Sequence, residues 1–171
     1  MKPQTLSGVA VVDKPRGATS HTVVAQARRL FGRKDIGHAG TLDPMATGVL
    51  LVLVGQATKL SGYLTADSKR YAAEVYFGRA THTLDAEGQT TAEAEVTAEQ
   101  LSPEAVARAL AEEQARTEQK PPAVSAIKVQ GERAYALTRQ GNAPDLPVRP
   151  VQVLELRVRE LATSVLRCEL H

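Results

Sequence analysis

Residues 37–48 hold the two side chains best suited to catalysis, His38 and Asp43, between three glycines. The sequence predicts a loop here, and glycine lets a loop adopt backbone angles that other residues avoid. A carboxylate fixed on a loop can act as a nucleophile or as a general base. The pair Asp43-Pro44 is also typical of a helix start, with the aspartate as N-cap and proline at the first helical position. Both interpretations are open, and they are compatible, because a capping carboxylate is an oriented one.

Tyr71 is the second chemical candidate, because it follows two basic residues, Lys69 and Arg70. On a strand such a ring can pack into the core, whereas in an RNA-binding protein it can stack on a nucleobase while its basic neighbours face phosphate. The chain has no Trp and only four Tyr and two Phe, so a stacking surface would depend on few rings. Basic residues in connecting segments also suit phosphate contacts. These are Lys14, Lys59, Lys120, Lys128 and Arg139.

Motifs of several other enzyme classes are absent from the sequence. There is no Gly-x-x-x-x-Gly-Lys-Ser/Thr phosphate loop and no Gly-x-Ser-x-Gly nucleophile elbow. The histidines and acids nearest to a metal-like grouping are His38, Asp43, His82 and Asp85, and their spacing matches no zinc signature. The single cysteine, Cys168, cannot form an internal disulfide, which is typical of the reducing cytoplasm. We therefore expect a cytoplasmic protein without a metal site.

The elements that position these residues are a mixture of strands and helices. Apolar runs and alternation predict strands at residues 9–12, 49–54, 70–77, 126–129, 151–158 and 165–170. Capping residues and glycine stops predict helices from Thr19 or Ser20 to Gly32, and at residues 57–64, 103–115 and 132–140. The first helix has one apolar face, made of Val23, Val24, Ala27, Leu30 and Phe31. The run at 49–54 is apolar throughout, which is typical of a central strand. Because no regular βαβ alternation is present, the fold class is α+β with a mixed or antiparallel sheet flanked by helices.

Length and charge narrow the class of protein further. At 171 residues and 18.3 kDa the chain has room for one domain with a core. Its longest apolar run, 49–54, is far shorter than the roughly 20 residues of a membrane helix, so we expect no membrane association. The net charge of +2 conceals a division, since residues 1–40 carry +5, residues 85–119 carry −7 and residues 120–171 carry +3. The basic segments can present a positive face to an anion, although such charges also occur on ordinary solvated surfaces.

Four sequence blocks, taken in order, resemble the TruB family of tRNA pseudouridine synthases. The blocks are Gly8–Pro15 with Gly17 and Thr19–His21; Gly37–Lys59; Lys69–Tyr71 with Gly78 and Thr81–Gly88; and Gln119–Lys128 with Gly131 and Tyr135. Together they span nearly the whole chain. The similarity is therefore highly specific, and chance does not explain the agreement of the four blocks.

The resemblance implies the pseudouridine synthase catalytic fold and an isomerase that converts the T-loop uridine at position 55 of tRNA to pseudouridine. Such a uridine must be flipped out of its loop to react. By position in the motifs, Asp43 is the nucleophile, Tyr71 stacks on the target base, and His38 lies against the flipped-out nucleotides. Tyr71 is a poor proton acceptor at neutral pH, because the reference pKa of tyrosine is about 10. Lys14 and Lys59 are candidate RNA contacts.

The resemblance also implies which partners the chain has. The family uses no metal and no cofactor. We expect tRNA as the partner of a monomeric chain that has no obligate protein partner.

Members of the family are longer than this chain. Beyond the position of His171 they have a further strand whose arginine pairs with the catalytic aspartate, and they usually carry a small C-terminal RNA-binding PUA domain. We therefore expect residues 1–171 to be the N-terminal portion of the catalytic domain, incomplete at the C-terminus and without a PUA domain. Within it, residues 85–119 form an acidic insertion that faces away from RNA. The alternative is a tRNA-binding or tRNA-folding module that does no chemistry.

These expectations predict that the 171-residue chain is inactive or very weak, while a version extended to the family length is active. The reason is that the arginine expected to pair with Asp43 lies beyond residue 171 in the family. Pseudouridine formation in unmodified tRNA, measured for both versions side by side, tests this. Robust turnover by the 171-residue chain would show that the expectation is wrong.

Overall fold

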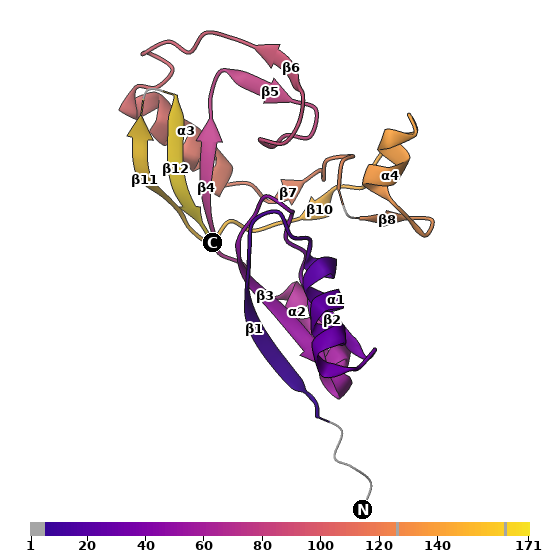
Figure 1. The fold of residues 1–171 in the computed structure, drawn as a ribbon. Helices are drawn as coiled ribbons and strands as arrows, with labels where there is room; N and C mark the ends of the chain where they lie inside the picture. The colour runs from indigo at the N-terminus through magenta and orange to yellow at the C-terminus, as the bar shows by residue number, and fades with distance from the viewer. Residues whose placement is uncertain (1–5, 126, 163) are drawn as a thin grey trace, which may run out of the picture. The chain divides into compact units, whose positions relative to one another are not determined.

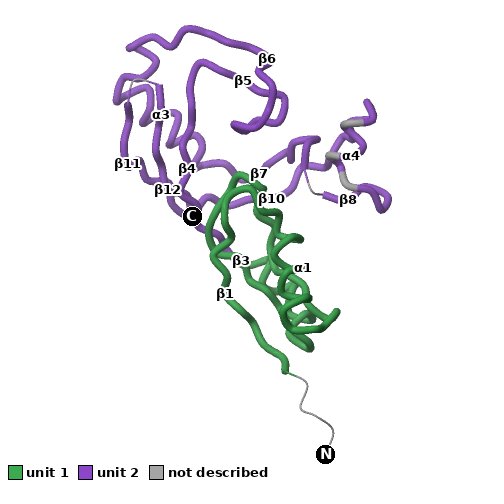
Figure 2. The backbone as a smooth tube through the Cα atoms, viewed as in Figure 1, with its two compact units in different colours: residues 1–67 green, residues 68–171 purple. Residues whose placement is uncertain are grey.

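The computed structural model describes residues 6–125, 127–162 and 164–171 (Figure 1). The chain forms two compact units, Met1–Asp67 and Ser68–His171 (Figure 2). All of the strand pairs among these residues are antiparallel. Together with the helices, they confirm the predicted α+β class.

The first unit contains a three-stranded sheet with the order β1-β3-β2. Its strands are β1 (Gly8–Lys14), β2 (Ile36–Ala39) and β3 (Gly48–Val54). The register runs from Gly8 opposite Val54 to Lys14 opposite Gly48, and places Ile36 opposite Val54 on the other side. β3 is the central strand, as its continuous apolar sequence predicts. β2 is a strand that the sequence analysis did not predict.

Helix α1 (Ser20–Phe31) packs on one face of this sheet and begins and ends at the predicted residues. The Thr19 side chain accepts a hydrogen bond from the Thr22 amide, and Gly32 ends the helix with a φ of 60°, which is unfavourable for residues that have a side chain. The core between helix and sheet consists of Val23, Val24, Ile36, Leu50, Val52 and Val54.

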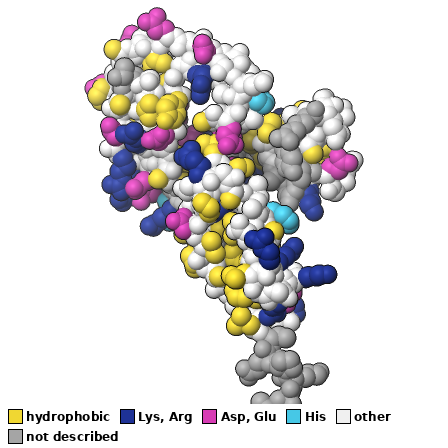
Figure 3. Space-filling model, viewed as in Figure 1, with side chains coloured by type: hydrophobic (Ala, Val, Ile, Leu, Met, Phe, Trp, Pro, Cys, Tyr) yellow, Lys and Arg dark blue, Asp and Glu magenta, His cyan; other side chains and the backbone are white. Residues whose placement is uncertain are grey.

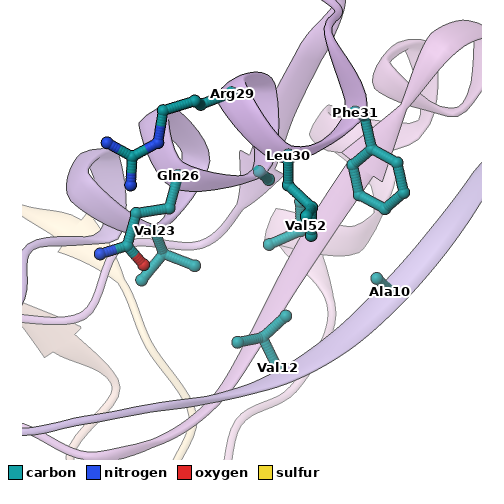
Figure 4. A pocket seen from close by; sticks show the side chains of 9 residues that line it. Ala10, Val12, Val23, Gln26, Arg29, Leu30, Phe31 and Val52 are labelled. Carbon is teal, nitrogen blue, oxygen red and sulfur yellow. The ribbon is translucent and has the colours of Figure 1, made fainter.

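The last turn of α1 departs from the predicted apolar face. Leu30 is 81% exposed and Phe31 is 46% exposed. Both line an open groove of about 740 Å³ between α1 and the sheet (Figure 4). Opposite them β1 presents only the small side chains of Ala10 and Val12, which leave the groove unfilled.

The other face of the sheet is covered in part by two short helices, the 3-10 helix η1 (Gly55–Leu60) and α2 (Ser61–Ala66). They replace the single helix predicted at residues 57–64. Ala39, Leu53 and Ala57 form a second small core there. Along β1 and the start of β3 this face is uncovered, so Val9, Val11 and Val49 are exposed, and Figure 3 shows hydrophobic side chains at the surface of this unit.

The second unit contains a sheet with the order β11-β12-β4. Its strands are β4 (Tyr71–Tyr76), β11 (Leu156–Ala162) and β12 (Val165–Leu170). β12 is central and carries the buried Leu166 and Cys168. The remaining elements are β5 (Arg79–Thr81), β6 (Thr90–Glu93), α3 (Pro103–Gln114), β7 (Glu118–Gln119), β8 (Lys128–Val129), β9 (Glu132–Arg133), α4 (Ala134–Arg139) and β10 (Arg149–Pro150).

The predicted elements of this unit are confirmed where the local signals are strong. The strands at 70–77 and 165–170 and the helix capped by Ser102 are present. The strand predicted at 151–158 is wrong in its position, because the paired segment is Leu156–Ala162. Ala126, the first residue of the strand predicted at 126–129, lies outside the described residues.

In the described part of the chain, no helix combines the length and the hydropathy needed to cross a membrane.

The core of the first unit generates a stability prediction. Leu53, near the end of the central strand β3, is 0% exposed, so Leu53→Ala should lower the free energy of unfolding by about 2–5 kcal/mol. Val11 is 70% exposed, so Val11→Ala should change it by less than about 0.5 kcal/mol. Urea unfolding followed by far-UV circular dichroism measures both, since the chain has no Trp. Equal losses for the two variants would contradict this core.

Candidate active site

Asp43 lies on the loop that joins β2 to β3, and the residue on each side of it is held by hydrogen bonds. The buried Ser20 hydroxyl accepts a bond from the Leu42 amide (3.0 Å) and also interacts with the Leu42 carbonyl (3.2 Å). On the other side, the Gly17 amide donates to the Pro44 carbonyl (2.7 Å). The start of α1 and the segment before it therefore fix the backbone on both sides of Asp43.

The Asp43-Pro44 pair begins a turn and not a helix. The Ala46 amide donates to the Asp43 carbonyl (3.1 Å), and the chain then becomes extended at Gly48, where β3 begins. The helix-cap interpretation is therefore wrong. The physical reason is that aspartate followed by proline is favourable both at a helix start and at the first two positions of a type I turn. The Asp43 side chain itself is exposed.

Lys14 lies at the end of β1 and is 0% exposed. Its Nζ donates to the carbonyls of Ala18 (2.7 Å), Pro15 (3.1 Å) and Pro44 (3.4 Å). Burial of an ammonium group is costly unless such dipoles replace its hydration. This placement gives Lys14 a structural role beside Asp43, in place of the phosphate contact expected from the sequence.

His38 lies on β2, opposite Val52, and is half-buried. Its Nδ1 is hydrogen-bonded to the Gly40 carbonyl. Because a carbonyl only accepts, Nδ1 carries the proton of this bond. The Ser61 hydroxyl donates to the His38 carbonyl (3.1 Å), and the Gly40 amide donates to the Thr65 hydroxyl (3.2 Å). Helix α2 thus holds the end of β2 where the Asp43 loop begins.

The structure brings together only part of the predicted site. His38 and Asp43 are the first and last residues of the segment 38–43 in the first unit. Lys59 is exposed and lies in η1 of the same unit. Tyr71 belongs to the second unit, at the start of β4 and opposite Leu170. Its side chain is 48% exposed, so it does not fill the core of its unit. The side chains of Tyr135 and Arg139 lie outside the described part of the chain.

Other candidates from the sequence have local structural roles. The Asp85 carboxylate accepts bonds from the Thr83 hydroxyl (2.6 Å) and from the Glu87 amide (3.0 Å), which closes the turn between β5 and β6. His82 Nδ1 accepts a bond from the Gln89 amide (3.0 Å) in the same turn. In the residues that the structure describes, no three His, Cys, Asp or Glu side chains gather as a metal site requires.

Sequence reasoning missed the residues that support the site. The sequence predicts Ser20 only as a possible helix cap, and Gly17 and Ser20 occur in the first family block without an assigned role. The sequence offers no signal for the roles of Ser20 and Gly17 except their position at and just before the start of α1. Their partners in the Asp43 loop are distant in sequence.

Comparison with known proteins places these residues in a family. Residues 28–171 match the N-terminal domain of the TruB family of pseudouridylate synthases. The chain is 50% identical over 154 residues to tRNA pseudouridine synthase B of Mycobacterium ulcerans (strain Agy99), which covers 90% of this chain and 50% of that protein. It is 50% identical over 157 residues to the protein of the same name from Mycobacterium avium (strain 104), covering 92% and 50%. The chain thus spans about half the length of the curated relatives it matches.

The fold has a related solved structure as well. A crystal structure of a Cbf5-Nop10-Gar1 complex contains a chain that is similar with a TM-score of 0.64 and 26% sequence identity. The match covers 95% of this chain and 38% of that one.

The geometry around Asp43 predicts that Lys14 supports its loop. Lys14→Met keeps the aliphatic stem but leaves three carbonyls without their donor, so it should lower the free energy of unfolding by about 1–3 kcal/mol. It should also speed hydrogen exchange at the Gly17 amide, whose acceptor is the Pro44 carbonyl. Lys34→Met, at an exposed lysine, is the matched control and should change neither quantity. Unchanged exchange at Gly17 in Lys14→Met would contradict the role.

Proposed function

Since this chain belongs to the TruB family of pseudouridine synthases, we propose that it provides the Asp43-bearing part of a tRNA pseudouridine synthase. The substrate is the T-loop uridine at position 55 of tRNA. The observation that carries the proposal is an exposed carboxylate on a turn whose neighbouring residues, Leu42 and Pro44, are both held by buried groups. We extend it to a monomeric chain that acts in the cytoplasm.

The net reaction exchanges one bond of the nucleoside for another. The bond between the sugar C1′ and the uracil N1 breaks, and a bond between C1′ and C5 forms. C5 loses a proton and N1 gains one, so the reaction needs no oxidant, reductant or second substrate. This balance fits a site made of side chains alone.

Asp43 acts as the nucleophile, attacking either a ring carbon of uracil or the sugar carbon, and leaves when the new bond has formed. The fixed turn supports this role, because a nucleophile held in position avoids an entropic cost on the way to the transition state. Tyr71 stacks on the target base, and its half-exposed ring is available for this contact. His38 contacts the flipped-out nucleotides, with its ring orientation set by the bond from Nδ1 to the Gly40 carbonyl.

A second candidate function is a tRNA-binding module that performs no chemistry. The observation in its favour is the half-exposed ring of Tyr71, which can stack on a base without any chemical step. This alternative shares the substrate of the first proposal and differs only in whether a product forms.

Replacement of the nucleophile separates the two candidates. In a version extended to the length of the relatives, Asp43→Asn should reduce pseudouridine formation in tRNA by a factor on the order of 10³ or more. Asp35→Asn, which changes a carboxylate of the same unit on the connection to β2, is the control and should remain active.

Binding of tRNA by the same variants completes the test. Asp43→Asn should bind tRNA as tightly as the parent, because the carboxylate acts in the chemical step. Turnover retained in Asp43→Asn would refute the nucleophile assignment, whereas tight binding with no product from the extended parent would favour the binding module.

A further inference from the structure

The chain turns between β1 and α1 at Arg16 and Gly17, and this turn is joined to the Asp43 turn. The Gly17 amide donates to the carbonyl of Pro44, the residue after Asp43 (2.7 Å). Gly17 has a φ of 84°, which glycine adopts readily and other residues avoid. The covalent bonds on either side of this hydrogen bond limit the distance between the Cα atoms of Arg16 and Asp43 to about 11 Å.

The buried Lys14 supports both turns and has no donor left for RNA. Its Nζ donates to three carbonyls, two of them in the segment 15–18 and one in the Asp43 turn. An ammonium group has three N–H donors, so this set engages all of them. The side chain is also 0% exposed. A phosphate contact at this place therefore needs another cation.

Arg16 is the exposed cation of the same turn. Two other arginines of the first unit are occupied by the fold. Arg33 donates to both carboxylate oxygens of Asp35 (2.9 and 2.6 Å), and Arg28 donates twice to the Ile36 carbonyl (3.1 and 2.7 Å). Among the residues that the structure describes, no carboxylate is paired with Arg16 and no carbonyl accepts a bond from its side chain. Its guanidinium therefore keeps its donors for a ligand.

The substrate of the proposed function brings an anion to this turn. The ribose of the target uridine is joined to a phosphate on each side, so a phosphate accompanies the nucleoside wherever Asp43 reaches it. The exposed Asp43 carboxylate has the same sign of charge and repels that phosphate, whereas a guanidinium can donate two parallel hydrogen bonds to it. Arg16 supplies the attraction that Asp43 lacks, from a backbone that is bonded to the same turn.

We propose that Arg16 binds a phosphodiester next to the target uridine, in the place that the sequence suggested for Lys14. The proposal rests on the proposed function, since it takes that RNA as the ligand. A backbone contact of this kind sets the position of the strand and carries no information about the base. Because the Arg16 turn is tied to the Asp43 turn, the bound phosphate places the sugar and the base relative to the carboxylate.

Binding and chemistry, measured separately in a version extended to the length of the relatives, test this contact. With an unmodified T-arm stem-loop RNA, Arg16→Gln should raise the Kd about 10-fold and reduce the salt slope of binding by about 1. The single-turnover rate at saturating enzyme should change by less than about 2-fold, because the contact is the same before and during the reaction. Arg16→Lys keeps the charge and should recover most of the affinity.

The same two measurements distinguish a phosphate contact from an action on Asp43. A slower single-turnover rate with an unchanged Kd in Arg16→Gln would overturn the proposal, because Arg16 would then act on the carboxylate. Arg29→Gln is the matched control. Arg29 is an exposed arginine in the last turn of α1, whereas Arg16 precedes the first turn of this helix, which is about 18 Å long. Equal losses of affinity in the two variants would also overturn the proposal, since they would reflect the general field of the protein.

The contacted phosphate can be located with RNAs that carry a single neutral methylphosphonate. Next to the target uridine this change should weaken binding by the parent but not by Arg16→Gln. Equal losses for parent and variant at every position would overturn the proposal. Failure of the proposed function has a different signature, because the extended parent would then form no pseudouridine and would bind the T-arm no better than a scrambled hairpin of the same length.

Discussion

The buried ammonium of Lys14 is the interaction on which the candidate active site depends. Its three carbonyl partners lie at the end of β1, just before α1, and in the turn that follows Asp43. The carbonyls replace the water that the ammonium has lost, and the ammonium in turn keeps the carbonyls together. Three segments of the first unit are therefore held in one arrangement, and Asp43 lies on one of them.

This arrangement restrains the backbone around Asp43, while the Asp43 side chain itself is exposed. Ser20, Gly17 and Lys14 all bond to main-chain atoms of the residues that flank Asp43. A nucleophile benefits from such support, because its direction is fixed without any loss of its reactive oxygens to hydrogen bonds. The restraint at His38 is of the same kind, since α2 bonds to the backbone of His38 and Gly40.

The second unit shows how unevenly the charges of a nearly neutral chain are distributed. Its acidic residues are concentrated in the segment 85–119, which includes α3, while its sheet contains arginines at 157, 159 and 167. What matters at each arginine is the number of carboxylates within reach. Arg167 has two, whereas Arg157 and Arg159 have one each. The local number of carboxylate partners, and not the net charge of +2, therefore decides how far each arginine is neutralised.

The sequence by itself determined the elements whose signals lie within a few residues. Helix α1 follows from Thr19 and Gly32, and the central place of β3 follows from its apolar run. The sequence also identified the family and Asp43 as the candidate nucleophile. It could not predict β2, because a segment containing Gly37 and His38 becomes a strand only through its pairing with β3. Only the tertiary structure decided that Asp43 begins a turn and that Lys14 is buried. The bonds that tie these residues to distant parts of the chain join residues 22 and 30 positions apart, and a local pattern contains no information about which distant carbonyl will solvate a given side chain.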